Sequence, residues 1–133
     1  MKEDIYSKLV RISRLKKQVR ESIGEIKGLT NPILTDYNQI PYIYDQCKTI
    51  LNGEAKIDVR RVFIFCVIYL YCPDRLFGGK APKRIRAACC QATGVKGVAI
   101  SLDCSAVLYL YQQEYFNNLV GRVMDVLQES LNL

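Results

Sequence analysis

Histidine and tryptophan are both absent from this sequence. Without histidine there is no Ser-His or Cys-His nucleophile pair, no imidazole acid or base and no histidine-ligated metal. The carboxylates are scattered, and Gly78-Gly79-Lys80 lacks the G-x4-G-K-[ST] spacing of a phosphate-binding loop. We therefore expect that the protein is not an enzyme and uses no cofactor or metal.

The sequence also lacks any C-x-x-C pair, and it has no long apolar segment. The six cysteines are expected to be reduced thiols that behave as small buried hydrophobic residues. No apolar signal-peptide segment follows Met1, and the longest apolar run, Val62 to Cys72, is too short to cross a bilayer. We expect a cytoplasmic protein without a membrane partner.

Positive charge is concentrated in two segments of the 133 residues, and the net charge is +6. Residues 75–102 contain six basic residues and no acidic one, while residues 1–28 contain eight basic and four acidic residues. Such blocks favour a polyanionic partner, with double-stranded DNA as the main candidate. The alternative for each segment is an ordinary solvated face.

Residues 1–28 are predicted to form a separate amphipathic helix that ends near Gly28, followed by a helical domain over residues 29–133. Apolar residues recur at steps of four and three, and Lys16 occupies the one interrupted position. This heptad-like seam either packs on the chain's own core or mediates self-association or binding to a partner protein. The seam residues are Ile5, Leu9, Ile12, Val19, Ile23 and Ile26.

The fold class is predicted to be all-α, a helical bundle. Asn31-Pro32 and Pro41 are candidate helix starts, and Asp58 is a candidate cap for the following helix. The run from Val62 to Tyr71 is rich in β-branched and aromatic residues. We interpret it as a helix buried nearly all round, because its neighbours look helical and no hairpin partner is visible.

Two further helices are predicted around Gly94, one from Lys83 to about Thr93 and one from about Lys96. The last third is predicted to be a long amphipathic helix or a bent pair, with Gly121 as a possible kink. Its apolar stripe contains Phe116, Leu119, Val123, Leu127 and Leu131.

A helix-turn-helix is predicted from the spacing of Cys90, Gly94 and Ile100. The first helix needs a small residue at the crossing, the turn needs glycine, and an aliphatic residue about six positions later packs the second helix on the first. In this register Lys96, Gly97, Val98, Ser101, Leu102 and Ser105 face the DNA major groove. The expected phosphate contacts come from Lys80, Lys83, Arg84 and Arg86.

The pattern of residues 58–118 resembles a group of small proteins from phages and mobile elements of gut bacteria. It comprises the apolar helix from Arg60, Gly78-Gly79-Lys80, the basic helix, Gly94-Val95, Ile100-Ser101 and Tyr109-Leu110-Tyr111-Gln112. The group is similar to the Trp-repressor-like DNA-binding domain of the bacterial replication initiator DnaA. The resemblance implies an all-α helix-turn-helix protein that acts in regulation, replication or packaging.

Two registers for the DNA-reading helix follow from these patterns, and we favour the one given by the glycine spacing, because it uses the turn geometry. The glycine spacing starts this helix near Lys96, whereas Asp103-Cys104-Ser105-Ala106-Val107, which resembles the initiator's Asp-His-Ser-Thr-Val signature, would start it near Asp103. An alternative function is a protein-interaction or assembly module without nucleic-acid binding. Its contact surfaces would be the N-terminal seam and six of the nine tyrosines, namely Tyr37, Tyr42, Tyr44, Tyr109, Tyr111 and Tyr115.

Overall fold

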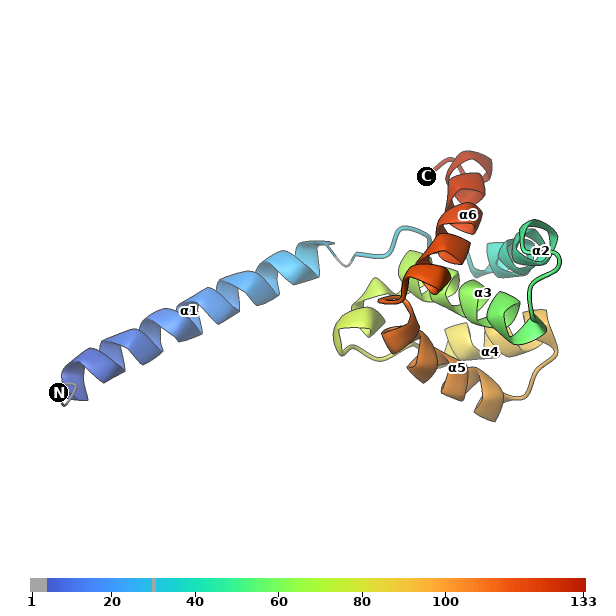
Figure 1. Ribbon diagram of the computed structural model, residues 1–133. Helices are drawn as coiled ribbons and strands as arrows, with labels where there is room; N and C mark the ends of the chain where they lie inside the picture. The colour runs from blue at the N-terminus through green and yellow to red at the C-terminus, as the bar shows by residue number, and fades with distance from the viewer. Residues whose placement is uncertain (1–4, 30) are drawn as a thin grey trace. The chain divides into compact units, whose positions relative to one another are not determined.

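The computed structural model describes residues 5–29 and 31–133, and the regular secondary structure of these residues is helical throughout, without a strand (Figure 1). The predicted all-α fold class is therefore confirmed for the described chain. The described residues divide into two units, with the boundary between Asn31 and Pro32. The helices are α1 (Ile5–Leu29), α2 (Ile40–Ile50), α3 (Lys56–Tyr71), α4 (Lys83–Thr93), α5 (Gly97–Leu110) and α6 (Glu114–Ser130), with short 3-10 helices η1 (Tyr37–Gln39) and η2 (Pro73–Phe77).

Helix α3 is the central element of the second unit, and it is buried along nearly its whole length. It packs against α2, α4, α5 and α6. Phe63, Ile64 and Val67 are fully buried, so apolar side chains on every side of this helix have a neighbour to contact. The helical interpretation of this segment is confirmed, because tertiary packing outweighs the β propensity of its residues.

Two predicted helix starts are wrong. Residues 31–36 are not helical, because the backbone amides of Ile33 and Leu34 both donate to the Leu70 carbonyl oxygen, at 2.9 and 2.8 Å. The segment is thereby tied to the end of α3. Asp58 is not the cap of α3, since Ala55 occupies that position and Asp58 lies in the first helical turn. Pro41, by contrast, does lie in the first turn of α2.

The last third of the chain is a pair of helices, α5 and α6, separated at residues 111–113. Gly121 lies inside a continuous α6, so a kink at this position is not observed. The predicted stripe is buried at Phe116, Leu119, Val123 and Leu127. On the same helix, the Arg122 guanidinium donates to the Ile50 carbonyl oxygen at 3.0 Å.

Within residues 5–29 and 31–133, no single helix has the length and apolar character needed to cross a membrane. Helices α4 and α5 taken together satisfy this criterion by length and composition, although they are bent by 110°.

Gly94 makes the turn between α4 and α5, and we call these two helices with their turn the α4–α5 corner. Its φ is +71°, a left-handed conformation that closes α4 with a hydrogen bond from the Gly94 amide to the Cys90 carbonyl oxygen. The predicted extent of α4 and its termination at Gly94 are confirmed. Cys90 and Gly97 meet at the crossing, where a Cβ added to Gly97 would lie 3.9 Å from the Cys90 sulfur.

We predict that Gly94→Ala lowers the free energy of unfolding by about 1 kcal/mol, because alanine resists the left-handed conformation. An added Cβ at Gly94 meets no atom within 4 Å, so the cost is conformational and not steric. Gly121→Ala is the matched control inside α6, and it should raise stability by up to about 1 kcal/mol. Urea denaturation measures the free energy of unfolding of both variants. Equal changes of the same sign would contradict the left-handed turn at Gly94.

Candidate nucleic-acid interface

Helix α5 has one buried face and one exposed face. Ile100, Asp103 and Val107 are buried against the core. On the opposite side Val98 is 76 % exposed and Leu102 is 66 % exposed. Of the other residues predicted to face DNA, Lys96, Gly97 and Ser105 are exposed and Ser101 is half-buried. The side of α5 that is predicted to face DNA therefore carries two apolar side chains that are exposed to solvent, Val98 and Leu102.

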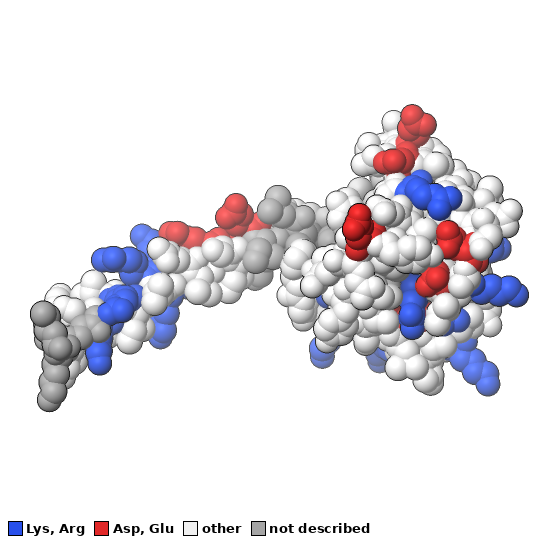
Figure 2. Space-filling view, viewed as in Figure 1, with Lys and Arg blue, Asp and Glu red and all other residues white. Residues whose placement is uncertain are grey.

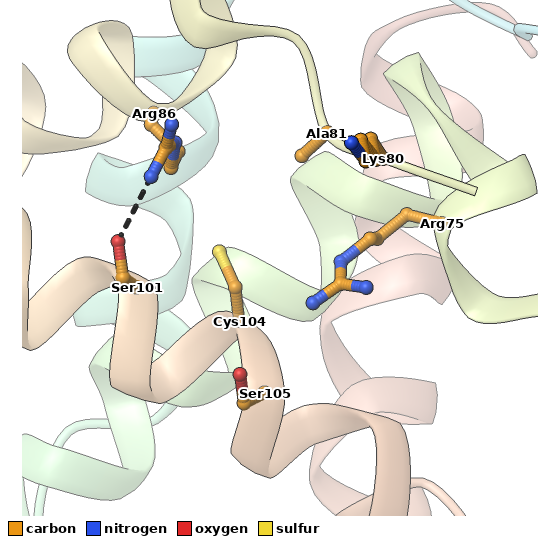
Figure 3. A pocket seen from close by; sticks show the side chains of 7 residues that line it. All are labelled: Arg75, Lys80, Ala81, Arg86, Ser101, Cys104 and Ser105. Carbon is orange, nitrogen blue, oxygen red and sulfur yellow. Dashed lines mark hydrogen bonds between the residues drawn. The ribbon is translucent and has the colours of Figure 1, made fainter. Parts of the chain in front are cut away.

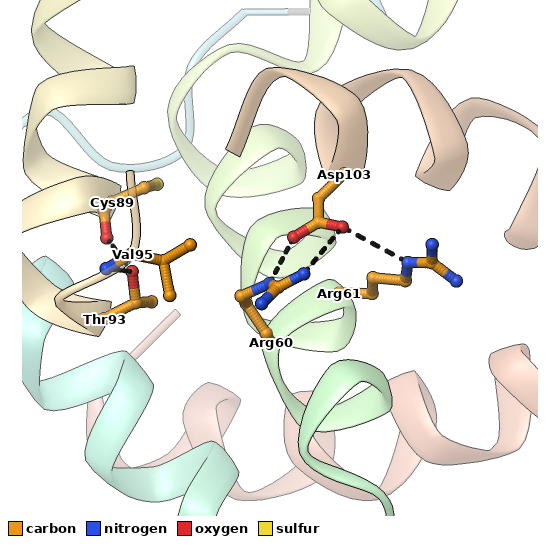
Figure 4. A network of polar contacts seen from close by, with 6 residues as sticks. All are labelled: Arg60, Arg61, Cys89, Thr93, Val95 and Asp103. Carbon is orange, nitrogen blue, oxygen red and sulfur yellow. Dashed lines mark hydrogen bonds and ion pairs between the residues drawn. The ribbon is translucent and has the colours of Figure 1, made fainter. Parts of the chain in front are cut away.

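The rotation of α5 is fixed by Asp103, the one buried charged residue in the described part of the chain (Figure 4). Its carboxylate accepts hydrogen bonds from Arg60 Nε, from Arg60 Nη2 at 3.3 Å and from Arg61 Nε at 3.3 Å. The bond with Asp103 raises the pKa of Arg60. Both arginines come from α3, so the ion pairs hold α5 against the central helix with the opposite face outward.

The same contacts decide between the two registers for the start of α5. The helix begins at Gly97 with Lys96 as its N-cap, as the glycine spacing predicts. A start near Asp103 is wrong, because this residue lies in the middle of the helix and is only 2 % exposed. Its sequence context gave no sign of burial, since the two arginines that compensate its charge lie more than forty positions earlier.

A groove runs between α4 and α5 on the exposed side, with a volume of about 650 Å³. Arg86 spans it, because its Nη1 donates to the Ser101 hydroxyl at 3.1 Å. No carboxylate lines the groove. The lining residues are Lys83, Arg86, Ala87, Cys90, Gly97, Val98, Ser101, Leu102 and Ser105.

A smaller pocket of about 270 Å³ adjoins this groove and shares Arg86, Ser101 and Ser105 with it (Figure 3). Lys80 and Arg75 complete its basic lining. Three of the five predicted cations, Lys80, Lys83 and Arg86, therefore lie beside α5. Arg75 joins them although the sequence argument omitted it. The sequence feature that could have identified Arg75 as a site residue is its position in segment 75–102, which contains no acidic residue.

The other two predicted cations, Arg84 and Lys96, lie outside the groove and the pocket. The Arg84 guanidinium is 5.1 Å from the centre of the Tyr37 ring, a cation–π contact with the 3-10 helix before α2. Lys96 is exposed at the N-terminus of α5 and lines neither the groove nor the pocket.

The loop before α4 is shaped by its two glycines. Gly78 has a φ of +97°, and a Cβ on Gly79 would lie 2.1 Å from an Asp74 carboxylate oxygen. Glycine is needed at position 79 because a side chain there would collide with Asp74. The close contact between Gly79 and Asp74 in turn fixes the backbone that carries Lys80. The Asp74 carboxylate lies against Gly79 and does not line the pocket.

Within its own unit, the seam of α1 is not covered by other described residues. Ile5 is 85 % exposed, and Leu9, Ile12, Val19 and Ile23 are between 47 and 58 % exposed. Ile26 belongs to the predicted seam, but its side chain lies outside the described residues. Basic side chains occupy the first part of α1, and acidic side chains follow in the later part (Figure 2). The acidic residues are Glu21 and Glu25.

The cysteines of the described chain are free thiols, and five of the six are buried. Burial raises the pKa of Cys72 to about 11, and it also raises the pKa of Cys89 and Cys104. These thiols therefore stay protonated near neutral pH, which suits packing better than nucleophilic attack. In the part of the chain that the structure describes, no cluster of Cys, Asp or Glu could hold a metal ion.

Comparison with protein-family models, curated proteins and solved structures finds no match for this chain. The resemblance to phage and initiator proteins stays a prediction.

We predict that Asp103→Asn lowers the free energy of unfolding by about 1.5–3 kcal/mol, because it removes charge-assisted hydrogen bonds from both α3 arginines. Asp125→Asn removes an exposed carboxylate from α6 and should change stability by less than about 0.5 kcal/mol. Urea denaturation of the two variants checks this, and an equally small loss for both would show that Asp103 does not hold α5.

Proposed function

We propose that this protein is a non-catalytic helix-turn-helix DNA-binding protein in which α5 enters the major groove. The resemblance described above suggests a phage or mobile element as its setting. One observation carries the proposal: Lys80, Lys83 and Arg86 line the exposed side of the α4–α5 corner, where no carboxylate lines the groove or the pocket. A polyanion is the partner that such a surface attracts.

The shape of the corner fits a duplex. The two helices meet at 110° across a three-residue turn, and the second is preceded by cations on the first. The major groove of B-DNA is about 12 Å wide and admits one α-helix. With α5 in that groove, Lys83 and Arg86 on α4 lie beside it, where they can contact the phosphate backbone.

Affinity in this arrangement comes mainly from phosphate contacts, because the exposed face of α5 carries no Arg, Asn or Gln able to pair with a base edge. Val98 and Leu102 are exposed apolar side chains, which suit contact with thymine methyl groups. Ser101 and Ser105 can hydrogen-bond to bases or phosphates. We therefore expect modest sequence preference and strong dependence on salt.

We predict that Lys83→Gln with Arg86→Gln weakens duplex binding by about tenfold or more, since two phosphate contacts are lost. The matched control is Lys48→Gln with Lys56→Gln, which removes the same charge from residues that line neither the groove nor the pocket. Fluorescence anisotropy with a labelled duplex of about 20 base pairs, at a fixed low salt concentration, measures both.

The control double variant should bind within about twofold of the wild type. Equal losses for the two double variants would mean that net charge alone drives binding. No binding by the wild type would remove the DNA proposal and leave the assembly proposal below.

As a second candidate function, we propose that α1 joins two copies of this chain. The exposure of Leu9, Ile12 and Val19 favours it, because a stripe of large apolar side chains in water is stabilised by a partner helix. An antiparallel pair fits the charges best. It places the basic first part of one helix beside Glu21 and Glu25 of the other, whereas a parallel pair aligns the cations with one another.

We predict that the wild-type chain sediments as a dimer at tens of micromolar concentration and that Ile12→Ser shifts it to the monomer, because the seam loses a central apolar contact. Val10→Ser is the matched control, since Val10 is also apolar and exposed but lies off the seam. Sedimentation equilibrium of the full chain tests this. If the wild-type chain sediments as a monomer, or if the two substitutions have equal effects, the seam does not mediate self-association.

A further inference from the structure

Arg75, Lys80 and Arg86 have no carboxylate within ion-pair distance among the described residues, in contrast to three arginines elsewhere in the same unit. Arg60 and Arg61 are paired with Asp103, and Arg122 lies 3.9 Å from Glu54. Three cations that share one small pocket repel one another, so an anion in the pocket would stabilise the arrangement.

The pocket supplies donors from three directions. Arg75 comes from η2, Lys80 from the glycine loop and Arg86 from α4, while Ser101 and Ser105 on α5 add hydroxyl groups (Figure 3). Cys104 forms part of the lining and is itself buried. Each guanidinium has five N–H donors, and the bonds from Arg75 to the Gly79 carbonyl oxygen and from Arg86 to Ser101 leave further donors available.

We infer that this pocket binds a single phosphate group, and that the group is a phosphodiester of the nucleic-acid backbone. A tetrahedral oxyanion offers enough acceptor oxygens for two guanidiniums, an ammonium and two hydroxyls at once, and arginine is the preferred planar donor for phosphate. The choice of a backbone phosphodiester rests on the proposed function, whereas the choice of phosphate rests on the pocket alone. Arg75 is thereby a binding residue outside the predicted set.

The pocket lies where a backbone phosphate would be needed. It shares Arg86, Ser101 and Ser105 with the α4–α5 groove, so a strand lying along the groove passes its mouth. A phosphate held there would fix the depth and rotation of α5 in the major groove without reading sequence.

The first experiment titrates the full chain with inorganic phosphate, at ionic strength held constant with sodium chloride, and follows backbone amide shifts by NMR. Wild-type protein should show saturable shifts at Ser101, Ser105 and Arg75. Arg75→Gln should weaken binding about tenfold, through loss of charge-assisted bonds. Ser105→Asp places a carboxylate on the exposed face of α5 and should abolish phosphate binding. Lys56→Gln should leave phosphate binding unchanged. If the wild type shows no saturable shifts, the inference that this pocket binds phosphate is overturned.

The second experiment measures the binding of a DNA duplex to wild type and Arg75→Gln as a function of salt. Loss of one phosphate contact should reduce the slope of log K against log salt by about one. An unchanged slope alongside bound inorganic phosphate would assign the pocket to free phosphate or a phosphorylated small molecule and overturn the backbone assignment. Wild-type duplex binding without any phosphate shift would leave the proposed function standing and the pocket refuted.

Discussion

The buried carboxylate of Asp103 is the interaction on which the exposed surface of this protein depends. Two arginines of the central helix α3 hold it, and this fixes the rotation of α5 about its own axis. Apolar packing of Ile100 and Val107 contributes to the same orientation. An apolar contact tolerates some rotation, whereas a hydrogen-bonded ion pair requires defined geometry. Because Asp103 faces inward, Val98 and Leu102 face solvent beside the cations of α4.

Charge is therefore used in two different ways within one small helical unit. Arg60 and Arg61 share one buried carboxylate, that of Asp103, and act structurally. Lys80, Lys83 and Arg86 have no acidic partner among the described residues, and they line open surfaces. Removing a partner from the first set should unfold or loosen the domain, while changes in the second set should alter binding and leave the fold intact. This separation is what makes the functional proposal testable.

The local elements were predictable from the sequence, and the long-range pairings were not. Gly94 and the basic run after Pro82 gave the bounds of α4, because turn geometry and charge pattern are local properties. The non-helical path of residues 31–36 depends on the Leu70 carbonyl, and the burial of Asp103 depends on α3. The contact between Arg84 and the Tyr37 ring is also non-local, so sequence alone counted this arginine with the groove cations. Arg75 was missed for the converse reason, since only the fold brings η2 to α5.

The central claim is that the α4–α5 corner binds duplex DNA through its phosphates. The most direct measurement is the affinity of the wild-type chain for a labelled duplex over a series of salt concentrations. With phosphate contacts from the four cations that line the groove and the pocket, we expect log K to fall with log salt at a slope of about −3.5 to −4. Absent binding, or binding that does not change with salt, would contradict the account.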